Sequence, residues 1–522
     1  MKAGYAQSSR RLRLLLDAVR GHWRDPVTSA EAGVSADNLS RSSSSTKSLS
    51  LRCFPLHHHD VQPSPVTPSD FHLLLCDKIR TAKRRVTLAS LYIGPAADPS
   101  YEKEIQLLDA LREASSRQVH VTILLDHNRA LRPVPCKNGT ITSAEACWKA
   151  LMSSPRRPDA SNFRIHLFSV LPDMLQRILP NPYNEVAGVF HIKAYIIDDE
   201  LILSGANLSE EYFSDRVDRY LHVTQPDLVQ CYEDMVDALC QYAHAYSYHN
   251  ETNHLEAPAI SRKQLVNSLK ALLTSDSPDA ALDTESKDAS KSIVAYAVPT
   301  FQAPRHFHRG IYARDTLRSD EEALHALIEA TAHTHRQDGG VEARIATAYL
   351  NPTKLLLSAL RCCEHSHFLT AGRVSHGFKP KPKAGNKGKD WIPTVFEYAA
   401  QQIRLNNVFV SYYQRPDWTF HSKGLWLTSF TESENVRLPP DATVYAVTHG
   451  SGNFGYRSSI RDLESNLVLV FPPGSPVAHD HVREWNQLCE FAVTAREEQK
   501  GSSPDGISAW IKLTFPIIRH FF

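Results

Sequence analysis

The sequence predicts an α/β protein of two similar lobes, each a mixed sheet flanked by helices, which face each other across a shared cleft. Three observations support this fold class. Strand-like apolar runs alternate with amphipathic helical stretches, as is typical of sheets that helices cover on both faces. The order strand, helix, strand, helix, strand and short polar motif occurs twice along the chain. The 522 residues are enough for two domains and their tails.

The elements of the two repeats follow one another in the same order. In the first repeat, apolar runs alternate with helical stretches, and these segments are 69–85, 84–94, 101–116, 119–126 and 163–172. In the second repeat, the corresponding apolar runs are 343–352, 367–374 and 407–416, with a helical stretch at 394–406.

A His-x-Lys motif closes each repeat. The first is His191 and Lys193 in VFHIKAYIIDD, and the second is His421 and Lys423 in TFHSKGLWLT. β-Branched and aromatic residues dominate the first motif, so it is predicted to lie on a strand. Side chains two residues apart on a strand point to the same face, which would bring each His and its Lys together.

A turn of small residues that ends in Asn follows each motif. The turn SGAN contains Ser204 and Asn207, and the turn GSGN contains Ser451 and Asn453. A single His-x-Lys pair would mean little in a chain with 26 His. Two copies with the same trailing turn are hard to obtain by chance, and they indicate two half-sites that meet over one phosphate.

The residue types suit phosphoryl transfer. Imidazole serves as nucleophile or as acid and base near neutral pH. Lys supplies positive charge to phosphoryl oxygens, and Asn and small-residue turns donate hydrogen bonds to them. One His would attack phosphorus while the other protonates the leaving oxygen. This scheme requires no metal and no cofactor.

The two motifs differ in the acid that follows them. Asp198 follows the first motif and is expected at the turn into the next strand or in the shell behind a His, whereas Thr428 occupies the equivalent place after the second. Glu464, in RDLES, is a candidate substitute for the missing acid. An equally weighted interpretation makes Glu464 a surface charge paired with Arg461.

These segments resemble a known family. The pattern H-x-K-x4-D with a trailing Gly/Ser-x-Asn turn is the signature of the phospholipase D superfamily. The segments HIKAYIIDDELILSGANLS, HSKGLWL and GSGNFGYRSSIRDLES, together with AKRRVTLASLYIG, resemble the phosphatidylglycerophosphate synthases of eukaryotic mitochondria. The resemblance spans roughly residues 66–475.

The resemblance implies a reaction in two steps. A His attacks CDP-diacylglycerol to give a phosphatidyl-histidine and CMP, and glycerol-3-phosphate then takes the phosphatidyl group. It implies His191 as nucleophile and His421 as acid/base, with Lys193, Lys423 and the two turn Asn residues on the phosphoryl oxygens. Asp198 would orient a His or compensate the cationic cluster. The reverse assignment of the two His residues stays open.

Further candidates are weaker. Tyr456 and Arg457 follow the second turn and could hold another phosphate, since Arg suits bidentate phosphate contacts. Ser90, Tyr92 and Gly94 in ASLYIGPA could lie near the nucleotide, although a buried first strand is the better interpretation.

The composition and the two ends of the chain indicate where in the cell the protein is expected. Arg-rich residues 1–24 and the Ser-rich stretch after them resemble a mitochondrial transit region, so peripheral attachment to the inner membrane is expected. The chain has no apolar run of the roughly 18–20 residues that a spanning helix needs. The proposed divisions are a presequence or disordered leader (1–65), a first lobe (66–250), a linker with a helix and a disordered stretch (251–292), a second lobe (293–500) and an interfacial segment that meets an anionic membrane (501–522).

Three alternatives remain at this stage. The first is a phosphatidylserine synthase of the same superfamily, which differs in the acceptor. The second is a phosphodiesterase acting on nucleic acid, which the net charge of +1 disfavours because such enzymes need a basic groove. The third is a non-catalytic scaffold, against which the intact second motif argues. The sequence leaves a homo-oligomer open.

Overall fold

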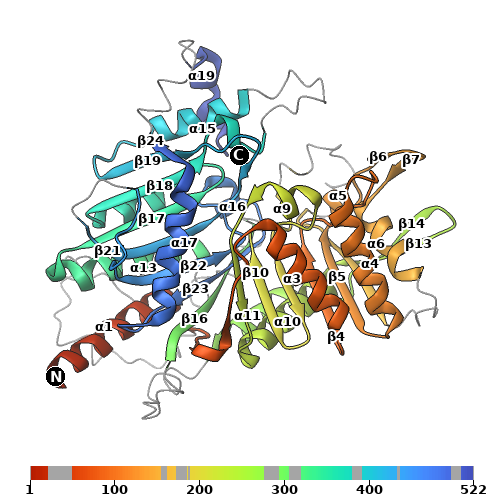
Figure 1. The fold of residues 1–522 in the computed structure, drawn as a ribbon, viewed down its shortest axis with the longest axis horizontal. Helices are drawn as coiled ribbons and strands as arrows, with labels where there is room; N and C mark the ends of the chain where they lie inside the picture. Colours follow the sequence, from red (N-terminus) through yellow and green to blue (C-terminus); the bar gives the residue numbers. More distant parts are fainter. Residues whose placement is uncertain are drawn as a thin grey trace.

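A computed structural model describes most of the chain. The described residues are 2–21, 50–153, 162–171, 185, 188–275, 293–304, 319–378, 391–431, 436–494 and 507–520. They form two large mixed sheets that lie side by side, with helices packed on both (Figure 1).

The first sheet has nine strands in the order β14-β13-β8-β5-β4-β9-β10-β12-β3. The strands are β3 (Val61–Gln62), β4 (Arg85–Ser90), β5 (His120–Asp126), β8 (Phe163–Phe168), β9 (Ala194–Ile197), β10 (Glu200–Ser204), β12 (Tyr220–Val223), β13 (His244–His249) and β14 (Thr252–Glu256). The pairs β4·β5 and β5·β8 are parallel, whereas β4·β9, β9·β10 and β10·β12 are antiparallel.

The second sheet also has nine strands, in the order β2-β16-β23-β22-β21-β17-β18-β19-β24. The strands are β2 (Phe54–His57), β16 (Ile293–Gln302), β17 (Val341–Thr347), β18 (His365–Ala371), β19 (Val408–Tyr413), β21 (Gly424–Ser429), β22 (Val444–Gly450), β23 (Glu464–Val470) and β24 (Ala492–Thr494). Its central six strands repeat the order and the directions of β8-β5-β4-β9-β10-β12. The predicted fold class and its duplication are therefore confirmed.

Helices cover the sheets. In the first lobe they are α3 (Pro68–Thr81), α4 (Glu102–Ser116), α5 (His127–Ala130), α6 (Ser143–Met152), α9 (Glu210–Ser214), α10 (Pro226–Tyr242) and α11 (Arg262–Leu273). In the second lobe they are α13 (Asp320–His335), α14 (Lys354–Ala359), α15 (Trp391–Gln401), α16 (Tyr456–Ile460), α17 (Pro476–Leu488) and α19 (Ala509–Ile518). Capping boxes start two of the longest: Thr67 with Asp70 begins α3, and Ser319 with Glu322 begins α13.

The N-terminal region differs from the disordered leader that the sequence predicts. Residues Lys2–Arg20 form helix α1, and Leu15, Leu16 and Val19 are buried in the core of the second lobe. The leucine and valine spacing gives the helix one apolar stripe, which packs on α13 and β23. Residues 22–49 lie outside the described residues. Strand β1 (Ser50–Leu51) then pairs with β15 (Thr274–Ser275).

The segments predicted as linker and tail are partly ordered elements. The helix expected within 251–292 is α11, which packs on α10 through Leu265 and Leu269. Residues 276–292, the disordered part of that prediction, lie outside the described residues. In the C-terminal segment, α19 packs on α15 through Ile511 and Phe515. Among the described helices, none has the length and apolar character to cross a membrane.

Candidate active site

The two His-x-Lys segments lie where the two lobes meet. They were predicted to be part of strands, but β9 begins at Ala194 and β21 at Gly424, just after each motif. The reason is that each segment pairs with the other lobe instead of its own sheet. The N–H of His191 donates to the carbonyl of Leu463 at 2.8 Å, and the N–H of His421 donates to the carbonyl of Val217 at 2.9 Å.

The pairing between lobes is reciprocal. In one half, Phe190 forms a parallel bridge with Leu463. In the other half, β11 (Arg216–Val217) pairs in parallel with β20 (Thr419–Phe420). Each lobe thus places the segment that follows its own Asn turn beside the histidine of the other lobe. The site therefore requires both halves of the chain.

Glu464 lies against the first histidine. Its Oε2 accepts a hydrogen bond from Nδ1 of His191 at 2.8 Å, and its Oε1 accepts one from Ser458 at 2.7 Å. The carboxylate is fully buried. Glu464 was considered as the acid of the second motif or as a surface partner of Arg461, and both interpretations are corrected here: it serves His191. This contact leaves Nε2 of His191 without a hydrogen bond in the described residues.

Asp218 takes the same place at the second histidine. Its Oδ2 lies 2.7 Å from Nδ1 of His421. The Nζ of Lys423 lies 2.6 Å from the same nitrogen, and we assign the Nδ1 proton to the Asp218 contact because a carboxylate can only accept. Sequence reasoning missed Asp218. The signal was present: Asp218 follows Asn207 at the spacing at which Glu464 follows Asn453.

Asp198 does not reach either histidine. It lies at the turn between β9 and β10, with φ of 52°, and its carboxylate accepts hydrogen bonds from the backbone N–H groups of Lys83, Arg84 and Arg85. Although partial burial opposes the effect, these donors hold the pKa of Asp198 below its usual value. The catalytic role expected for Asp198 is therefore corrected to a structural one. Thr428 occupies the position of Asp198 in the second motif, and its lack of a carboxylate does not deprive either histidine of a partner.

Both histidines are held neutral. Burial, followed by the charge of Lys193, keeps the pKa of His191 well below its ordinary value. Burial, followed by the charge of Lys423, does the same to the pKa of His421. Because Nδ1 of each ring faces a carboxylate, the lone pair of each neutral ring lies on Nε2. The Nε2 of His421 lies 3.3 Å from the hydroxyl of Tyr212, which can donate to it.

The two lysines are buried beside the histidines. Nζ of Lys193 donates to the carbonyl of His191 at 2.7 Å, and Nζ of Lys423 donates to the carbonyl of His421. Burial lowers the pKa of Lys193 to about 7 and that of Lys423 to about 8. Burial also raises the pKa of Glu464 to about 7. A bound phosphate anion would stabilise the protonated lysines.

The Asn turns present side chains with unused oxygen atoms. Oδ1 of Asn207 and Oδ1 of Asn453 are buried and have no hydrogen-bond partner in the described residues. The serines in the same turns are committed elsewhere. Ser204 donates to the carbonyl of Arg219 at 2.8 Å, and Ser451 donates to that of Ser465 at 3.3 Å. The amides remain candidates for substrate contact, whereas the serine hydroxyls stabilise the turns.

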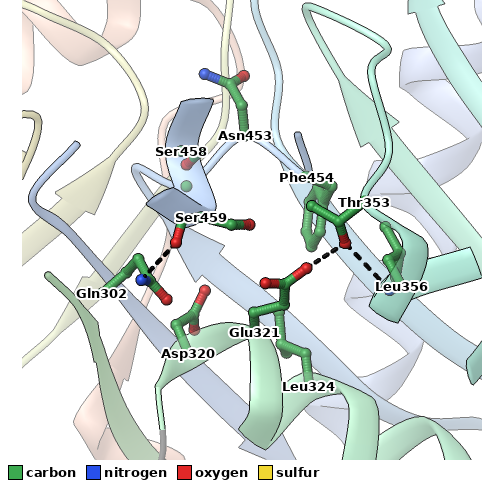
Figure 2. Close-up of a pocket in the computed structure, with 11 residues that line it drawn as sticks. Gln302, Asp320, Glu321, Leu324, Thr353, Leu356, Asn453, Phe454, Ser458 and Ser459 are labelled. Atoms are coloured by element: carbon green, nitrogen blue, oxygen red, sulfur yellow. Dashed lines mark hydrogen bonds between the residues drawn. The ribbon is translucent and has the colours of Figure 1, made fainter. Parts of the chain in front are cut away.

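A small cavity of about 30 Å³ lies beneath the second turn. Figure 2 shows Asn453 at its edge, with the amide directed away from Asp320 and Glu321. Asp320 accepts from Nδ2 of Asn466 at 2.7 Å, and Oδ1 of Asn466 accepts from the N–H of Gly452 at 3.2 Å. A Cβ at Gly452 would lie 2.6 Å from that amide. Asp320, which lines the cavity, therefore stabilises the second turn through Asn466.

Tyr456 and Arg457, predicted to bind a phosphate, are engaged within the protein. The Nε of Arg457 donates to Asp462 at 3.1 Å, and its Nη2 donates to the carbonyl of Glu185 at 2.9 Å. The guanidinium of Arg519 lies 4.1 Å above the ring of Tyr456. The structure thus gives both residues partners within the protein, and Arg457 connects Asp462 of the second lobe to Glu185 of the first.

The three residues predicted near the nucleotide have different surroundings. Ser90 is buried and donates to the carbonyl of Tyr92 at 3.1 Å. A Cβ at Gly94 would clash with the carboxylate of Glu104, so the glycine permits a close packing contact. Tyr92 lies 3.3 Å from the hydroxyl of Ser209, beside the first turn. Gly94 also lies beside this turn, since its N–H donates to the carbonyl of Leu208 at 2.6 Å.

Arg219 fastens the two lobes behind the site. Its guanidinium forms two hydrogen bonds of 2.8 Å with the carboxylate of Glu484 on α17. It also donates to the carbonyls of Lys423 and Thr448. A Cβ at Gly424 would collide with this guanidinium, which explains the glycine directly after the second motif. Because Arg219 follows Asp218, the contact fixes the carboxylate that holds His421.

Comparisons with known proteins agree with this geometry. Residues 75–240 match a family model described as "Cardiolipin synthase, PLD-like domain". This match covers most of the first lobe. The second lobe repeats its topology and carries the second motif.

The chain is also similar to known proteins over most of its length. The chain is 28% identical over 492 residues to the mitochondrial CDP-diacylglycerol–glycerol-3-phosphate 3-phosphatidyltransferase of Gallus gallus, covering 87% of this chain and 82% of that protein. It is 26% identical to the protein of that name from Homo sapiens, which also covers 87% of this chain and is itself covered to 82%. Among solved structures, the phosphatidylserine synthase of Haemophilus influenzae aligns with a TM-score of 0.63 at 17% identity, over 90% of this chain and 97% of that one. This likeness shows the fold.

Two groups of side chains in the described part of the chain could hold a metal ion. They are Glu342 with His365 and His367, and His449 with His481 and Glu484. Neither includes a histidine of the two motifs. In the second group the Arg219 guanidinium already contacts His449 and Glu484. The described residues of the site at the seam contribute histidine, carboxylate, lysine and amide groups.

The pKa values of this site predict a narrow pH profile. We expect kcat/KM for the phosphatidyl donor to fall on the acid side near pH 7, where Glu464 becomes protonated and stops polarising His191. We expect it to fall on the alkaline side between about pH 7 and 8, where Lys193 and Lys423 lose their protons. These limbs belong to the coupled cluster. A pH series of initial rates measures both.

Lys193→Arg provides the control for this assignment. Because a guanidinium stays protonated, the alkaline limb should move to higher pH in this variant while the acid limb stays in place. An alkaline limb at the same pH in Lys193→Arg and Lys423→Arg would contradict the assignment to the lysines.

Proposed function

We propose that this protein is a phosphatidyltransferase that converts CDP-diacylglycerol and glycerol-3-phosphate into phosphatidylglycerophosphate and CMP. The observation that carries the proposal is the seam between the lobes, where each motif histidine hydrogen-bonds to a buried carboxylate of the other lobe. The identity of 26–28% over 87% of the chain to transferases of that name supports the substrates. The same names support a mitochondrial location.

In the first step, Nε2 of His191 attacks the phosphorus of the phosphatidyl group. The bond from phosphorus to the CMP oxygen breaks, and CMP leaves as an anion. Glu464 stabilises the positive charge that develops on the attacking ring, as a carboxylate behind a histidine does in other enzymes. Lys193 and Lys423, with the Asn207 and Asn453 amides, stabilise the negative charge on the phosphoryl oxygens.

In the second step, the hydroxyl of glycerol-3-phosphate attacks the same phosphorus, and the bond to Nε2 of His191 breaks. The hydroxyl proton passes to Nε2 of His421. A histidine held neutral by burial suits the role of base in this step. His421 was expected to act as both acid and base. This assignment makes it a base in the second step only, since CMP leaves as an anion and needs no proton.

Product formation tests the proposal. Purified protein should release CMP from CDP-diacylglycerol and form phosphatidylglycerophosphate with glycerol-3-phosphate, in the presence of excess EDTA. Serine is offered in a parallel reaction, because the fold is shared with a phosphatidylserine synthase. Product with serine alone would reject the proposed acceptor. Activity lost in EDTA and restored by one metal would reject the metal-free scheme.

Helix α19 is proposed to lie on the membrane that holds the donor lipid. Ile511 and Phe515 are buried against α15, while Trp510, Leu513 and Ile517 are exposed, Leu513 to 83%. An exposed apolar ridge with Trp at one end is typical of a helix in the membrane interface. Residues 501–506 of the predicted interfacial segment lie outside the described residues.

Liposome binding tests the α19 surface. Leu513→Asp with Ile517→Asp should reduce sedimentation with anionic liposomes by roughly tenfold, because two apolar side chains that would leave water become charged. Turnover of a donor dispersed in detergent should change little. As a matched control, Leu73→Asp changes another exposed leucine, on α3, and should bind liposomes like the unchanged protein. Unchanged sedimentation of the α19 variant would reject this surface.

A further inference from the structure

The two Asn turns and the segments after them correspond residue by residue. Asn207 and Asp218 in the first lobe match Asn453 and Glu464 in the second, with no insertion between them. The correspondence extends to one ion pair in each lobe. Arg216 pairs with Glu211 at 2.6 Å, and Arg457 pairs with Asp462 at 3.1 Å.

The polarity of this ion pair is reversed between the lobes. Arg216 corresponds to Asp462, and Glu211 corresponds to Arg457. Arg216 lies on β11, opposite Thr419 and two residues before Asp218, so its positive charge is next to the strand that leads to His421. The equivalent position near His191 carries Asp462, whose Oδ1 accepts from the N–H of Val189 at 3.0 Å. The position two residues before the motif carboxylate is therefore basic in the half of His421 and acidic in the half of His191.

The guanidinium of Arg216 has one N–H donor, on Nε, without a hydrogen-bond acceptor in the described residues. Its side chain is 12% exposed, and its Nε is buried with no hydrogen-bond partner in the described residues. It stacks 4.4 Å above the ring of Tyr212, whose hydroxyl lies 3.3 Å from Nε2 of His421. A buried donor without a partner is costly, and a ligand that accepts from it would remove that cost.

In each of the two proposed steps, a group that carries a phosphate lies on the His421 side of the reacting phosphorus. The group that leaves and the group that attacks lie opposite the nucleophile, and therefore beside His421 if His191 is the nucleophile. The leaving CMP carries a phosphate, and the attacking glycerol-3-phosphate carries a second phosphate away from its reacting hydroxyl. A water molecule that attacked instead would carry none.

Building on the proposed function, we propose that Arg216 binds the phosphate of the acceptor and so selects glycerol-3-phosphate over water. Planar guanidinium groups bind phosphate oxygens through two parallel hydrogen bonds, and Arg216 has both Nε and an Nη group for this contact. Tyr212 holds the guanidinium in place next to the base His421. Arg457 lacks this capacity because its Nε and Nη2 have partners inside the protein.

Acceptor kinetics test the inference. In Arg216→Gln, the KM for glycerol-3-phosphate should rise at least tenfold, and the product should shift toward phosphatidic acid, which forms when water takes the phosphatidyl group. The burst of CMP that accompanies formation of the phosphatidyl-enzyme reports the first step separately. Arg216→Lys should recover part of the affinity because it restores the charge without the planar geometry.

Glu211→Gln separates phosphate binding from a structural ion pair. This variant removes the carboxylate that Arg216 contacts but leaves the guanidinium. If Arg216 binds phosphate, the KM for glycerol-3-phosphate should stay at or below the value of the unchanged protein. If the ion pair only stabilises the fold, both variants should raise KM alike, and this result would overturn the inference.

Two further results would also overturn it. One is an unchanged KM and product ratio in Arg216→Gln, and the other is a larger rise of KM in Arg457→Gln than in Arg216→Gln. Failure of the proposed function is distinguishable, because then the unchanged protein itself would form no phosphatidylglycerophosphate. Circular dichroism of each variant verifies that the fold is intact.

Discussion

His191→Ala is expected to abolish formation of a covalent phosphatidyl-enzyme and to lower kcat by at least roughly 10⁴-fold, as removal of a nucleophile does in other two-step enzymes. The physical reason is that Nδ1 of His191 is held by Glu464, while its Nε2 has no hydrogen-bond partner in the described residues and carries the lone pair. His421→Ala should behave differently. The first step needs no base at His421, so the covalent intermediate should form and then persist, because its transfer to the acceptor slows by roughly 10²–10⁴-fold.

The measurement uses CDP-diacylglycerol labelled with ³²P in the phosphate that stays with the lipid. Acid-labile, hydroxylamine-sensitive label on the protein should accumulate in His421→Ala and be absent in His191→Ala. The opposite pattern would assign the nucleophile to His421 and would reverse the two roles. Label in neither variant, with a normal signal in the unchanged protein, would reject a division of labour between the two histidines.

Glu464→Gln and Asp218→Asn are each expected to lower kcat by about 10²–10⁴-fold while the fold is retained, in line with carboxylate replacements behind catalytic histidines elsewhere. Each carboxylate orients the ring of the histidine from the opposite lobe and stabilises its charged form. The two variants should fail at different steps. Glu464→Gln should slow formation of the labelled intermediate, whereas Asp218→Asn should slow its transfer to glycerol-3-phosphate.

Asp198→Asn is the matched control for these two variants. Its carboxylate caps the backbone of residues 83–85 and is remote from both histidines in the hydrogen-bond network. We expect a loss of thermal stability, since charge-assisted hydrogen bonds to three donors are weakened, with kcat changed by less than about threefold. A loss of kcat as large as that of Glu464→Gln would restore Asp198 to the reaction.

The duplicated fold could be predicted because its signals are local. Alternating apolar runs and amphipathic helices report which strands are covered on both faces, and both series of runs became central strands of the two sheets. The motif histidines and lysines were also visible, since their spacing and their trailing Asn turns recur. Those residues lie together at the seam between the lobes, where the duplication alone suggested a shared site.

Other features could not be predicted, because they depend on contacts between segments far apart in the chain. The partner of His191 is 273 residues away, and that of His421 is 203 residues away. Asp198 fits the H-x-K-x4-D pattern in the sequence, but its carboxylate accepts hydrogen bonds from the backbone of residues 83–85 and contacts neither histidine. The N-terminal helix is Arg-rich like a transit region, yet three of its apolar residues are buried in the second lobe.

The two α/β lobes, each with one His-x-Lys motif and one Asn turn, can be predicted from the amino-acid order, because strand and helix periodicity and short turns are encoded locally. The pairing of each carboxylate with its histidine follows from the three-dimensional fold. The reason is that the motif segments leave their own sheets and pair with the opposite lobe, so that Glu464 and Asp218 exchange places across the seam. The same pairing places Arg216 next to the strand of His421, where the other half has Asp462, and this difference distinguishes the two halves of a repeated site.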